Sequence, residues 1–247
     1  MNDKTKNNEN QDSIGSNLAL VKMSFLNNQF ELDELDENFF ERLKTKIEPV
    51  QKVVSYYRCA LMEVETKFKV LNENFLFLHD RNPIDSIKTR IKEPDSIRKK
   101  LRKLQLPLDI NSIENINDIA GVRILCPFIN DIYMLSDCLL RQDNVELFEK
   151  KDYIANPKPN GYRSLHLIIR IPIFFQNEKR LVKVEIQFRT IAMEFWANLE
   201  HRLRYKKNIN EKMMVKLSDE LNECAEICTM LDRKMQNIQN SLNSNKK

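Results

Sequence analysis

The amino-acid sequence predicts an α/β (α+β) fold in which a mixed β-sheet is flanked by helices. Three observations lead to this prediction. Apolar residues recur every three or four positions over residues 33–80 and again from residue 214 onward, which is typical of helices. Between these segments, short alternating strands and helical segments follow one another. With 247 residues, of which 42% are hydrophobic, the chain can bury one substantial core.

Helices are predicted at both ends of the chain. An apolar stripe runs through Phe39, Leu43 and Ile47 and resumes at Val50, so we expect two N-terminal helices that meet near Pro49. A C-terminal amphipathic stripe alternates spacings of three and four through Met214, Leu217, Leu221, Cys224, Cys228, Leu231, Met235, Ile238 and Leu242. This stripe must be covered, either by the first helices of the same chain or by another subunit. The polar, asparagine-rich residues 1–20 predict a disordered tail.

The middle of the chain alternates strands and helices. Period-two patterns predict strands at residues 86–92, 116–128, 145–154, 164–175 and 181–189. Helical spacing predicts helices at residues 96–104, 130–141 and 190–206, the first of them opened by Pro94 and Asp95. This order is typical of a mixed sheet covered by helices.

The composition excludes several classes of protein. The only three glycines are Gly15, Gly121 and Gly161, so the phosphate loops GxGxxG and GxxxxGK[ST] are impossible and side chains must hold any bound phosphate. The net charge of +4 is too small to indicate nucleic-acid binding by itself. No apolar run approaches the roughly 20 residues that span a membrane, and the five cysteines include no CxxC pair. We therefore expect a soluble, cytoplasmic protein with reduced, buried thiols.

Two carboxylates mark a candidate metal site. In VKVEIQFR, residues 182–189, the apolar side chains share one strand face, and Glu185 lies on the other face with Gln187. Asp118 enters an otherwise apolar segment shortly before an Ala-Gly pair. If the two carboxylates meet on one face of the sheet, they form an oxygen site that suits Mg²⁺ and leaves positions for phosphate. The alternatives are a solvated polar face for Glu185 and a turn or helix cap for Asp118.

Basic residues surround these carboxylates in the sequence. Arg90 and Lys92 share one face of the first predicted strand, and five basic side chains crowd the helix that follows. That helix is either an ordinary solvated surface or a place where phosphates bind. Arg123 lies in an apolar strand, where an unpaired guanidinium is costly, so it needs an anionic partner, either a carboxylate or a ligand.

The segment KDYIANPKPNGYRSLH, residues 151–166, combines two prolines, a glycine, three cationic side chains, aromatic rings and a histidine. The prolines and Gly161 restrict the backbone, which favours a fixed orientation for Tyr162. Taken alone, Tyr162 would be an ordinary loop aromatic and His166 a hydrogen-bonded strand histidine.

Four blocks carry a resemblance to a known family. They are RIKEPDSIRKKL, INDIAGVRILCPF, KDYIANPKPNGYRSLHLIIRIP and VEIQFRTIAMEFWANLEHRLRYK, in this order, over about residues 82–207. Together they resemble the signature blocks of the RelA/SpoT-type (p)ppGpp synthetase domain, and their close succession resembles the small alarmone synthetases. The resemblance implies a nucleotidyltransferase-like fold and a GTP pyrophosphokinase of the stringent response. Such an enzyme transfers the β,γ-pyrophosphate of ATP to the 3′-hydroxyl of GDP or GTP and releases AMP.

The resemblance also implies roles for individual residues. Asp118 and Glu185 would be the catalytic residues and the ligands of Mg²⁺, with Glu185 a metal ligand or the base for the 3′-hydroxyl. The ATP-binding positions would be Arg90, Lys92, Ser96, Lys100 and Arg123. The GDP- or GTP-binding positions would be Lys158, Asn160, Tyr162, His166, Gln187 and Glu200, with Tyr162 stacked on the guanine.

The expected organisation is a tail over residues 1–20, a synthetase domain over residues 21–210 and an oligomerisation helix over residues 211–247, within a homotetramer. The long relatives carry an HD hydrolase domain, but no histidine precedes the dipeptide His79-Asp80. We therefore expect synthesis without hydrolysis. The sequence also ends before a regulatory region that senses the ribosome could fit, so we expect no activation by the ribosome. Some small synthetases use an aromatic residue shortly before the RxK block for activation by their product. The corresponding stretch here, NPIDSIKTR, contains no aromatic residue, so we do not expect product activation through that site.

Two alternatives stay open from the sequence. The basic helix is compatible with a non-catalytic regulator that binds RNA or a nucleotide, although the two carboxylates favour an enzyme. A related enzyme that transfers AMP rather than pyrophosphate would release inorganic pyrophosphate.

Overall fold

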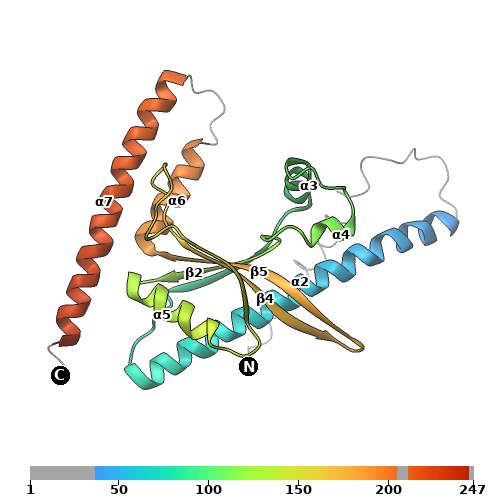
Figure 1. Ribbon diagram of the computed structural model, residues 1–247, viewed down its shortest axis with the longest axis horizontal. Coiled ribbons are helices and arrows are strands. Elements are labelled where there is room, and N and C mark those ends of the chain that lie inside the picture. Colours follow the sequence, from blue (N-terminus) through green and yellow to red (C-terminus); the bar gives the residue numbers. More distant parts are fainter. Residues whose placement is uncertain (1–36, 205–210, 245–247) are drawn as a thin grey trace, which may run out of the picture. The chain divides into compact units, whose positions relative to one another are not determined.

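The computed structural model contains a five-stranded sheet (Figure 1). The structure describes residues 37–204 and 211–244, with side chains over 48–203 and 217–244, so the expected tail lies outside the described residues. The chain divides into two compact units, Met1–Ser55 with Lys92–Ile116 and Tyr56–Ile91 with Asn117–Lys247.

The first unit contains the short helices α3 and α4. Helix α3, Pro94–Lys103, begins at a proline, whose fixed φ and missing N–H suit the first turn of a helix. Helix α4, Ile110–Ile113, is a single turn capped by Asp109, whose carboxylate accepts a hydrogen bond from the Ser112 N–H at 2.7 Å. The helix after Pro94 is therefore confirmed, whereas α4 has no counterpart among the predicted elements.

The prediction of two N-terminal helices meeting near Pro49 is wrong. Helix α2 runs without interruption over Glu37–His79, with Pro49 inside it, and passes from the first unit into the second at Tyr56. A proline removes the one backbone hydrogen bond that its N–H would donate. The residues on both sides continue the helix despite this loss. In the second unit, the buried stripe of α2 consists of Tyr56, Tyr57, Ala60, Leu61, Val64 and Phe68.

The sheet of the second unit has the strand order β1-β2-β5-β4-β3. Its strands are β1 Ser86–Ile91, β2 Ala120–Cys126, β3 Glu146–Asp152, β4 Leu165–Phe175 and β5 Glu178–Thr190. Strands β2 and β5 pair in parallel, and the other neighbours pair antiparallel. The five predicted strands and the mixed sheet are confirmed. Asp118, however, lies in the turn before β2 and not on the strand itself.

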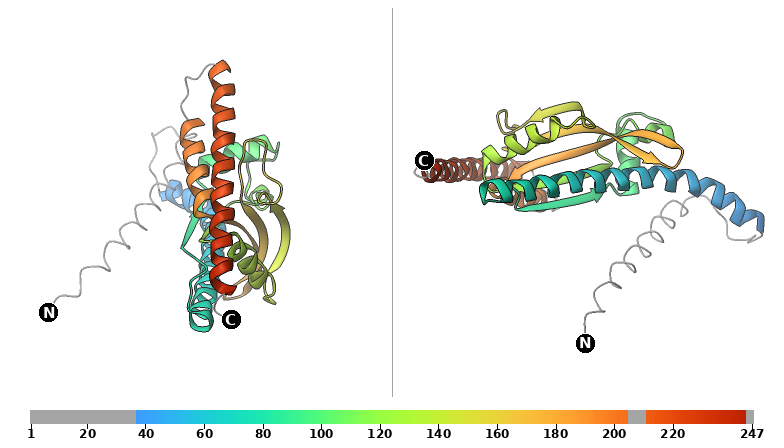
Figure 2. Two further views of the ribbon diagram at one scale, coloured as in Figure 1. Left: turned by 90° about the vertical axis from the view of Figure 1, so that its left-hand side faces the viewer. Right: turned by 90° about the horizontal axis from the view of Figure 1, so that it is seen from below.

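One face of this sheet forms the core of the second unit. The buried residues of β5 on this face are Val182, Val184, Ile186 and Phe188, as the alternation predicted. The ring of Phe68 on α2 meets the ring of Phe188 edge-on, with 5.6 Å between the centroids. Helix α5, Ile129–Leu140, contributes Ile132, Leu135 and Leu139 to the core, and Figure 2 (right) shows α5 and α2 on the same side of the strands. The opposite face of the sheet therefore carries the polar side chains.

Helices α6, Ile191–Arg204, and α7, Glu211–Ser244, lie side by side (Figure 1). Trp196 packs against Ala225, and its indole N–H donates a hydrogen bond to the Leu221 carbonyl at 2.8 Å. The predicted stripe divides here: Leu221 and Cys228 pack against this cluster. In contrast, Leu231, Met235, Ile238 and Leu242 are between 44% and 61% exposed. We call these four residues the α7 seam.

The cysteines are only partly as expected. All five are free, but only Cys126 is buried, and Cys224 is exposed. The prediction of buried thiols is wrong for Cys224, because the side of α7 that packs against Trp196 carries Ala225 and Cys228 instead. Within residues 37–204 and 211–244, the structure contains no helix with both the length and the apolar character needed to cross a membrane.

Candidate active site

Polar residues from separate strands lie in rows across the face of the sheet that is opposite the core. One row of paired positions contains Lys88, Arg123, Gln187 and His166. The next row contains Arg90, Gly121 and Glu185. A Cβ atom at Gly121 would lie 3.4 Å from Nε of Arg90, so the arginine side chain lies over the glycine that neighbours Glu185. The parallel pairing of β2 with β5 thus gathers residues that are far apart in the sequence.

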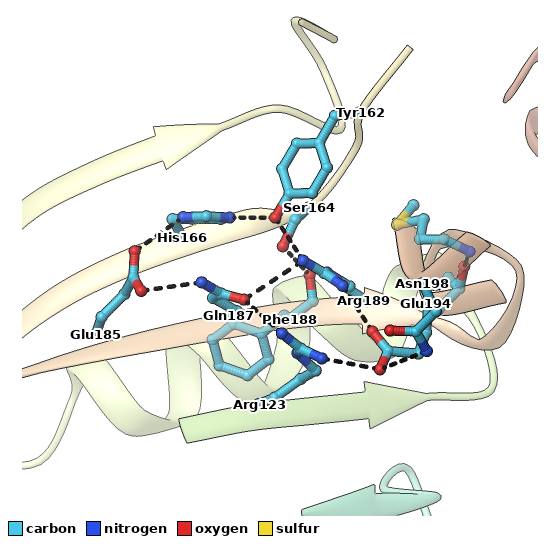
Figure 3. Close-up of polar contacts among 12 residues, drawn as sticks. Arg123, Tyr162, Ser164, His166, Glu185, Gln187, Phe188, Arg189, Glu194 and Asn198 are labelled. Atoms are coloured by element: carbon cyan, nitrogen blue, oxygen red, sulfur yellow. Dashed lines mark hydrogen bonds and ion pairs between the residues drawn. The ribbon is translucent and has the colours of Figure 1, made fainter. Parts of the chain in front are cut away.

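Both carboxylate oxygens of Glu185 are held by neighbours (Figure 3). His166 Nδ1 lies 3.2 Å from Oε1, and Gln187 Nε2 donates to Oε2 at 2.9 Å. The Tyr162 hydroxyl lies 2.8 Å from His166 Nε2 and accepts from Arg189 Nη2 at 2.7 Å. Because an ionised carboxylate only accepts, His166 donates from Nδ1 to Glu185. A chain of hydrogen bonds therefore links Arg189 to Glu185.

Glu185 is ionised at neutral pH and lies near a second carboxylate. Burial raises its pKa, but the hydrogen bond and charge of His166, with the hydrogen bond from Gln187, outweigh burial and leave the pKa below the ordinary value of 4.5. The charge of Asp118 acts on the pKa of Glu185 in the raising direction, so the two carboxylates interact. Among the described residues, no group of three or more His, Cys, Asp or Glu side chains could hold a metal. A cation held by two carboxylates would complete its shell with water or phosphate oxygens, as Mg²⁺ does.

Glu194 of α6 anchors two arginines (Figure 3). Its Oε1 accepts from Arg123 Nη1 at 2.9 Å, and its Oε2 accepts from Arg189 Nη1 at 2.7 Å. Burial raises the pKa of Glu194, but the hydrogen bond from Arg189 and the charges of both guanidiniums outweigh burial and hold the pKa below its usual value. Of the two partners expected for Arg123, the structure contains the carboxylate. Arg123 also approaches Gln187 Oε1, at 3.4 Å, and so joins the Glu185 cluster.

Residues 153–164 between β3 and β4 contain the candidates Lys158, Asn160 and Tyr162. We call this segment the acceptor loop, because the sequence blocks predict that it binds the acceptor nucleotide. Asn160 donates to Glu200 Oε1 at 3.2 Å, and its own side-chain oxygen accepts from the Tyr162 N–H at 3.3 Å. Lys158 Nζ lies 4.4 Å and 4.9 Å from the ring centroids of Tyr153 and Tyr162. The Gly161 N–H closes a turn onto the Lys158 carbonyl at 2.8 Å, with a φ of +83° that favours glycine.

Comparison with known proteins identifies the family. Residues 89–210 match the model of a region found in RelA / SpoT proteins. GTP pyrophosphokinase YwaC of Bacillus subtilis (strain 168) is 43% identical over 206 residues, which cover 83% of this chain and 97% of that protein. The chain belongs to the RelA/SpoT family. It is accordingly a (p)ppGpp synthetase of the GTP pyrophosphokinase class.

Solved structures of small alarmone synthetases share the fold of this RelA/SpoT protein. Small alarmone synthetase 1 from Bacillus subtilis, bound to its product pppGpp, matches with a TM-score of 0.70 and 36% identity over 77% of this chain and 96% of that chain. The same synthetase bound to AMPCPP matches with a TM-score of 0.65 and 31% identity over 79% and 98% of the two chains. The predicted family, fold class and enzyme class are confirmed. A non-catalytic regulator and an AMP transferase are the disfavoured alternatives.

The predicted site residues of this RelA/SpoT synthetase fall into two groups. The second unit contains Asp118, Glu185, Arg90, Arg123 and the acceptor positions Lys158, Asn160, Tyr162, His166, Gln187 and Glu200. Lys92, Ser96 and Lys100 belong to the first unit, where Ser96 and Lys100 lie one turn apart on α3. The contacts above connect the acceptor positions with one another and with Glu185. The ligand assigned to each residue remains a prediction.

Three residues of this cluster had no predicted role: Tyr153, Arg189 and Glu194. Arg189 shares the polar face of β5 with Glu185 and Gln187, which is a signal for it in the alternation. Glu194 stands among apolar residues in IAMEFWA, and a carboxylate on the buried side of a helix requires a cationic partner. Tyr153 belongs to the acceptor loop, and its ring meets His166 edge-on at 5.3 Å between centroids.

Proposed function

We propose that this synthetase uses ATP as donor and GDP or GTP as acceptor, with Mg²⁺ held by Asp118 and Glu185. The observation that carries this proposal is an ionised Glu185, hydrogen-bonded at both oxygens, beside a second carboxylate on a sheet face that also presents arginines. The pppGpp and AMPCPP complexes of small alarmone synthetase 1 support a guanosine nucleotide and an adenosine polyphosphate as ligands. The donor-site assignment of Lys92, Ser96 and Lys100 rests on the sequence blocks.

The reaction exchanges one phosphorus–oxygen bond for another. The 3′-oxygen of the acceptor attacks the β-phosphorus of ATP, the bond from that phosphorus to the oxygen bridging the α- and β-phosphates breaks, and AMP leaves with that oxygen. The hydroxyl proton goes to the carboxylate of Glu185 and then to water. Bound Mg²⁺ would neutralise polyphosphate charge. Arg90 and Arg123 would bind phosphate oxygens in the forked geometry that guanidinium groups favour.

The acceptor loop supplies the groups that would recognise the guanosine nucleotide. We assign the guanine to the face of Tyr162, next to Lys158, whose ammonium already lies over that ring. Asn160 and Glu200 offer donor and acceptor groups for the base edge, while His166 and Gln187 lie next to Glu185 and hence near the reacting hydroxyl. In this assignment, the base would lie away from the carboxylate of Glu185 and the ribose would lie beside that carboxylate.

The products of the reaction test this function. Incubation with γ-labelled ATP, GDP and Mg²⁺ is expected to yield AMP and a labelled guanosine tetraphosphate, separable by thin-layer chromatography. Omitting Mg²⁺ is expected to stop the reaction, because the polyphosphate charge is then not neutralised. Unlabelled guanosine product accompanied by labelled inorganic pyrophosphate would instead show AMP transfer and refute the proposal.

We further propose a cytoplasmic homotetramer assembled through the terminal helices. The α7 seam is one exposed apolar stripe, and α6 carries another at Ile191, Phe195 and Leu199, each at least 40% exposed. Apolar stripes at helical spacing are typical of helix–helix interfaces. A cytoplasmic location fits the nucleotide substrates and the five free thiols.

Charges in the α7 seam are expected to break this assembly. The double substitution Met235→Glu and Ile238→Glu puts two carboxylates into the apolar contact, so the mass in solution should fall below that of the wild type. We expect about four times the 29.4 kDa chain mass for the wild type by light scattering. Lys234→Glu, at an exposed neighbouring position, is the control and should leave the mass unchanged. A monomeric wild type would contradict the proposal.

A further inference from the structure

Arg163 of the acceptor loop is bound to helix α7. Its Nη1 donates to the Thr229 hydroxyl at 2.6 Å, and its Nη2 donates to the Ile154 carbonyl, at the start of the same loop, at 2.6 Å. The Thr229 hydroxyl in turn donates to the Ala225 carbonyl at 2.8 Å. Because the Thr229 hydroxyl donates its only proton to the Ala225 carbonyl, its oxygen is left to accept the hydrogen bond from Arg163. One guanidinium therefore connects both ends of the loop with α7.

From Thr229 onward, the packed face of α7 is polar although it is buried. Asp232 is 7% exposed and accepts a hydrogen bond from the Thr190 hydroxyl at 2.8 Å, and Gln236 is 8% exposed and accepts from the Asn130 N–H at 2.9 Å. The apolar α7 seam is exposed instead. An amphipathic helix held only by apolar burial would show the reverse arrangement. The polar face of α7 thus specifies a position relative to the loop and to the end of β5.

Gly161, two residues before Arg163, also contacts α7. A Cβ atom at Gly161 would lie 2.6 Å from Cβ of Ala225, so no larger residue fits without movement of the helix or the loop. Tyr162 stands between these two anchored residues. With the backbone fixed on both sides, its hydroxyl reaches His166 Nε2 and Arg189 Nη2.

From these contacts we propose that Arg163 and Thr229 are positioning residues for the acceptor nucleotide, and that α7 sets the place of the Tyr162 ring through the neighbours of Tyr162. Neither residue needs to touch the nucleotide. The inference rests on the proposed assignment of the acceptor loop to GDP or GTP. It extends that assignment to a helix that supplies none of the predicted ligand-binding residues.

Thr229→Val tests this role, because it keeps the shape of the side chain and removes the hydroxyl that Arg163 binds. We expect the KM for GDP to rise about tenfold, the usual effect of losing one hydrogen bond to a charged group. The KM for ATP and the melting temperature should stay within about twofold and a few degrees of the wild type. Thr229→Ser keeps the hydroxyl and should restore the KM for GDP. A folding defect alone would not raise the KM for GDP while leaving the KM for ATP unchanged.

A second variant covers the case in which an unpaired buried guanidinium prevents folding. Arg163→Met removes the charge together with the contact, and it should raise the KM for GDP as Thr229→Val does. Both changes break the same hydrogen bond. The KM for GDP of the double variant should therefore be no higher than that of Arg163→Met alone. Additive effects of the two changes would refute the proposed connection.

Tyr162→Ala separates this inference from the assignment on which it rests. If that variant leaves the KM for GDP unchanged, the acceptor-site assignment is wrong. If Tyr162→Ala raises the KM for GDP while Thr229→Val and Arg163→Met leave it unchanged, the positioning role of α7 is refuted and the assignment stands. If Thr229→Val and Arg163→Met change the KM for GDP and the KM for ATP equally, the positioning role of α7 is likewise refuted.

Discussion

Glu185→Gln is expected to lower the turnover of (p)ppGpp synthesis by about 10²–10⁴-fold, the range for loss of a group that transfers a proton. The amide keeps the size of the side chain but can neither take the proton of the 3′-hydroxyl nor attract a divalent cation. The turnover number at saturating ATP and GDP, measured by AMP release, checks this expectation. Circular dichroism and the melting temperature should match the wild type, since the change adds no volume to the core.

Glu146→Gln is the matched control for this experiment. Glu146 lies on the edge strand β3, 53% exposed, and its carboxylate pairs with Arg170 at 2.8 Å, so the same chemical change occurs on the same sheet outside the cluster. Its turnover should be that of the wild type. Asp118→Asn should resemble Glu185→Gln if the two carboxylates share one cation. Full activity in either site variant would disprove the assignment of the metal and the base.

Glu194→Gln is expected to destabilise the fold more than any other single change in the site. The substitution leaves Arg123 and Arg189 without the carboxylate that both of them bind. Breaking a buried ion pair costs about 3–5 kcal/mol, and we expect the lower end of this range because the Arg123 side chain is 26% exposed. Unfolding in urea should measure this loss, and Glu146→Gln, which breaks an exposed pair, should cost less than about 1 kcal/mol. Equal stability of the two variants would contradict the anchoring role of Glu194.

The effect of Glu194→Gln is also expected to depend on pH. A carboxylate whose pKa is lowered on folding stabilises the folded state above its ordinary pKa, here 4.5, and this contribution is lost as the pH falls through the lower pKa of the folded protein. The difference in stability between wild type and variant should therefore be full at pH 7 and narrow below about pH 4.5. A difference that stays constant down to the pH of acid unfolding would show that the charge of Glu194 is not the cause.

Local pattern was sufficient to predict the faces of β5. Because side chains alternate along any strand, the sequence of residues 181–189 already separates Val184 and Ile186 from Glu185 and Gln187. The family blocks added candidate residues on other strands, and the structure contains the contacts between Asn160 and Glu200 and between His166 and Glu185. None of these contacts follows from alternation.

Long-range pairing could not be predicted from a local pattern. Arg123 required an anionic partner, but a sequence does not state which of 36 acidic residues folds against it, and the partner Glu194 lies on a helix beyond three further strands. Likewise, heptad spacing identified α7 as amphipathic without revealing that the polar residues Thr229, Asp232 and Gln236 lie on its packed face. At Pro49 the local pattern was misleading. Proline is a strong local signal for the end of a helix, but the helical residues on both sides of Pro49 outweigh it, and α2 continues.

The parallel pairing of β2 with β5 also determines when a newly made chain can first act. The ribosome synthesises β2 before β3, β4 and β5, so Gly121 cannot meet Glu185 until all three of these later strands have been made. Pairing over such a separation is slow compared with the formation of helices. Thr229 is made later still. A nascent chain therefore has no complete active site until both β5 and the turn of α7 that carries Thr229 have been synthesised.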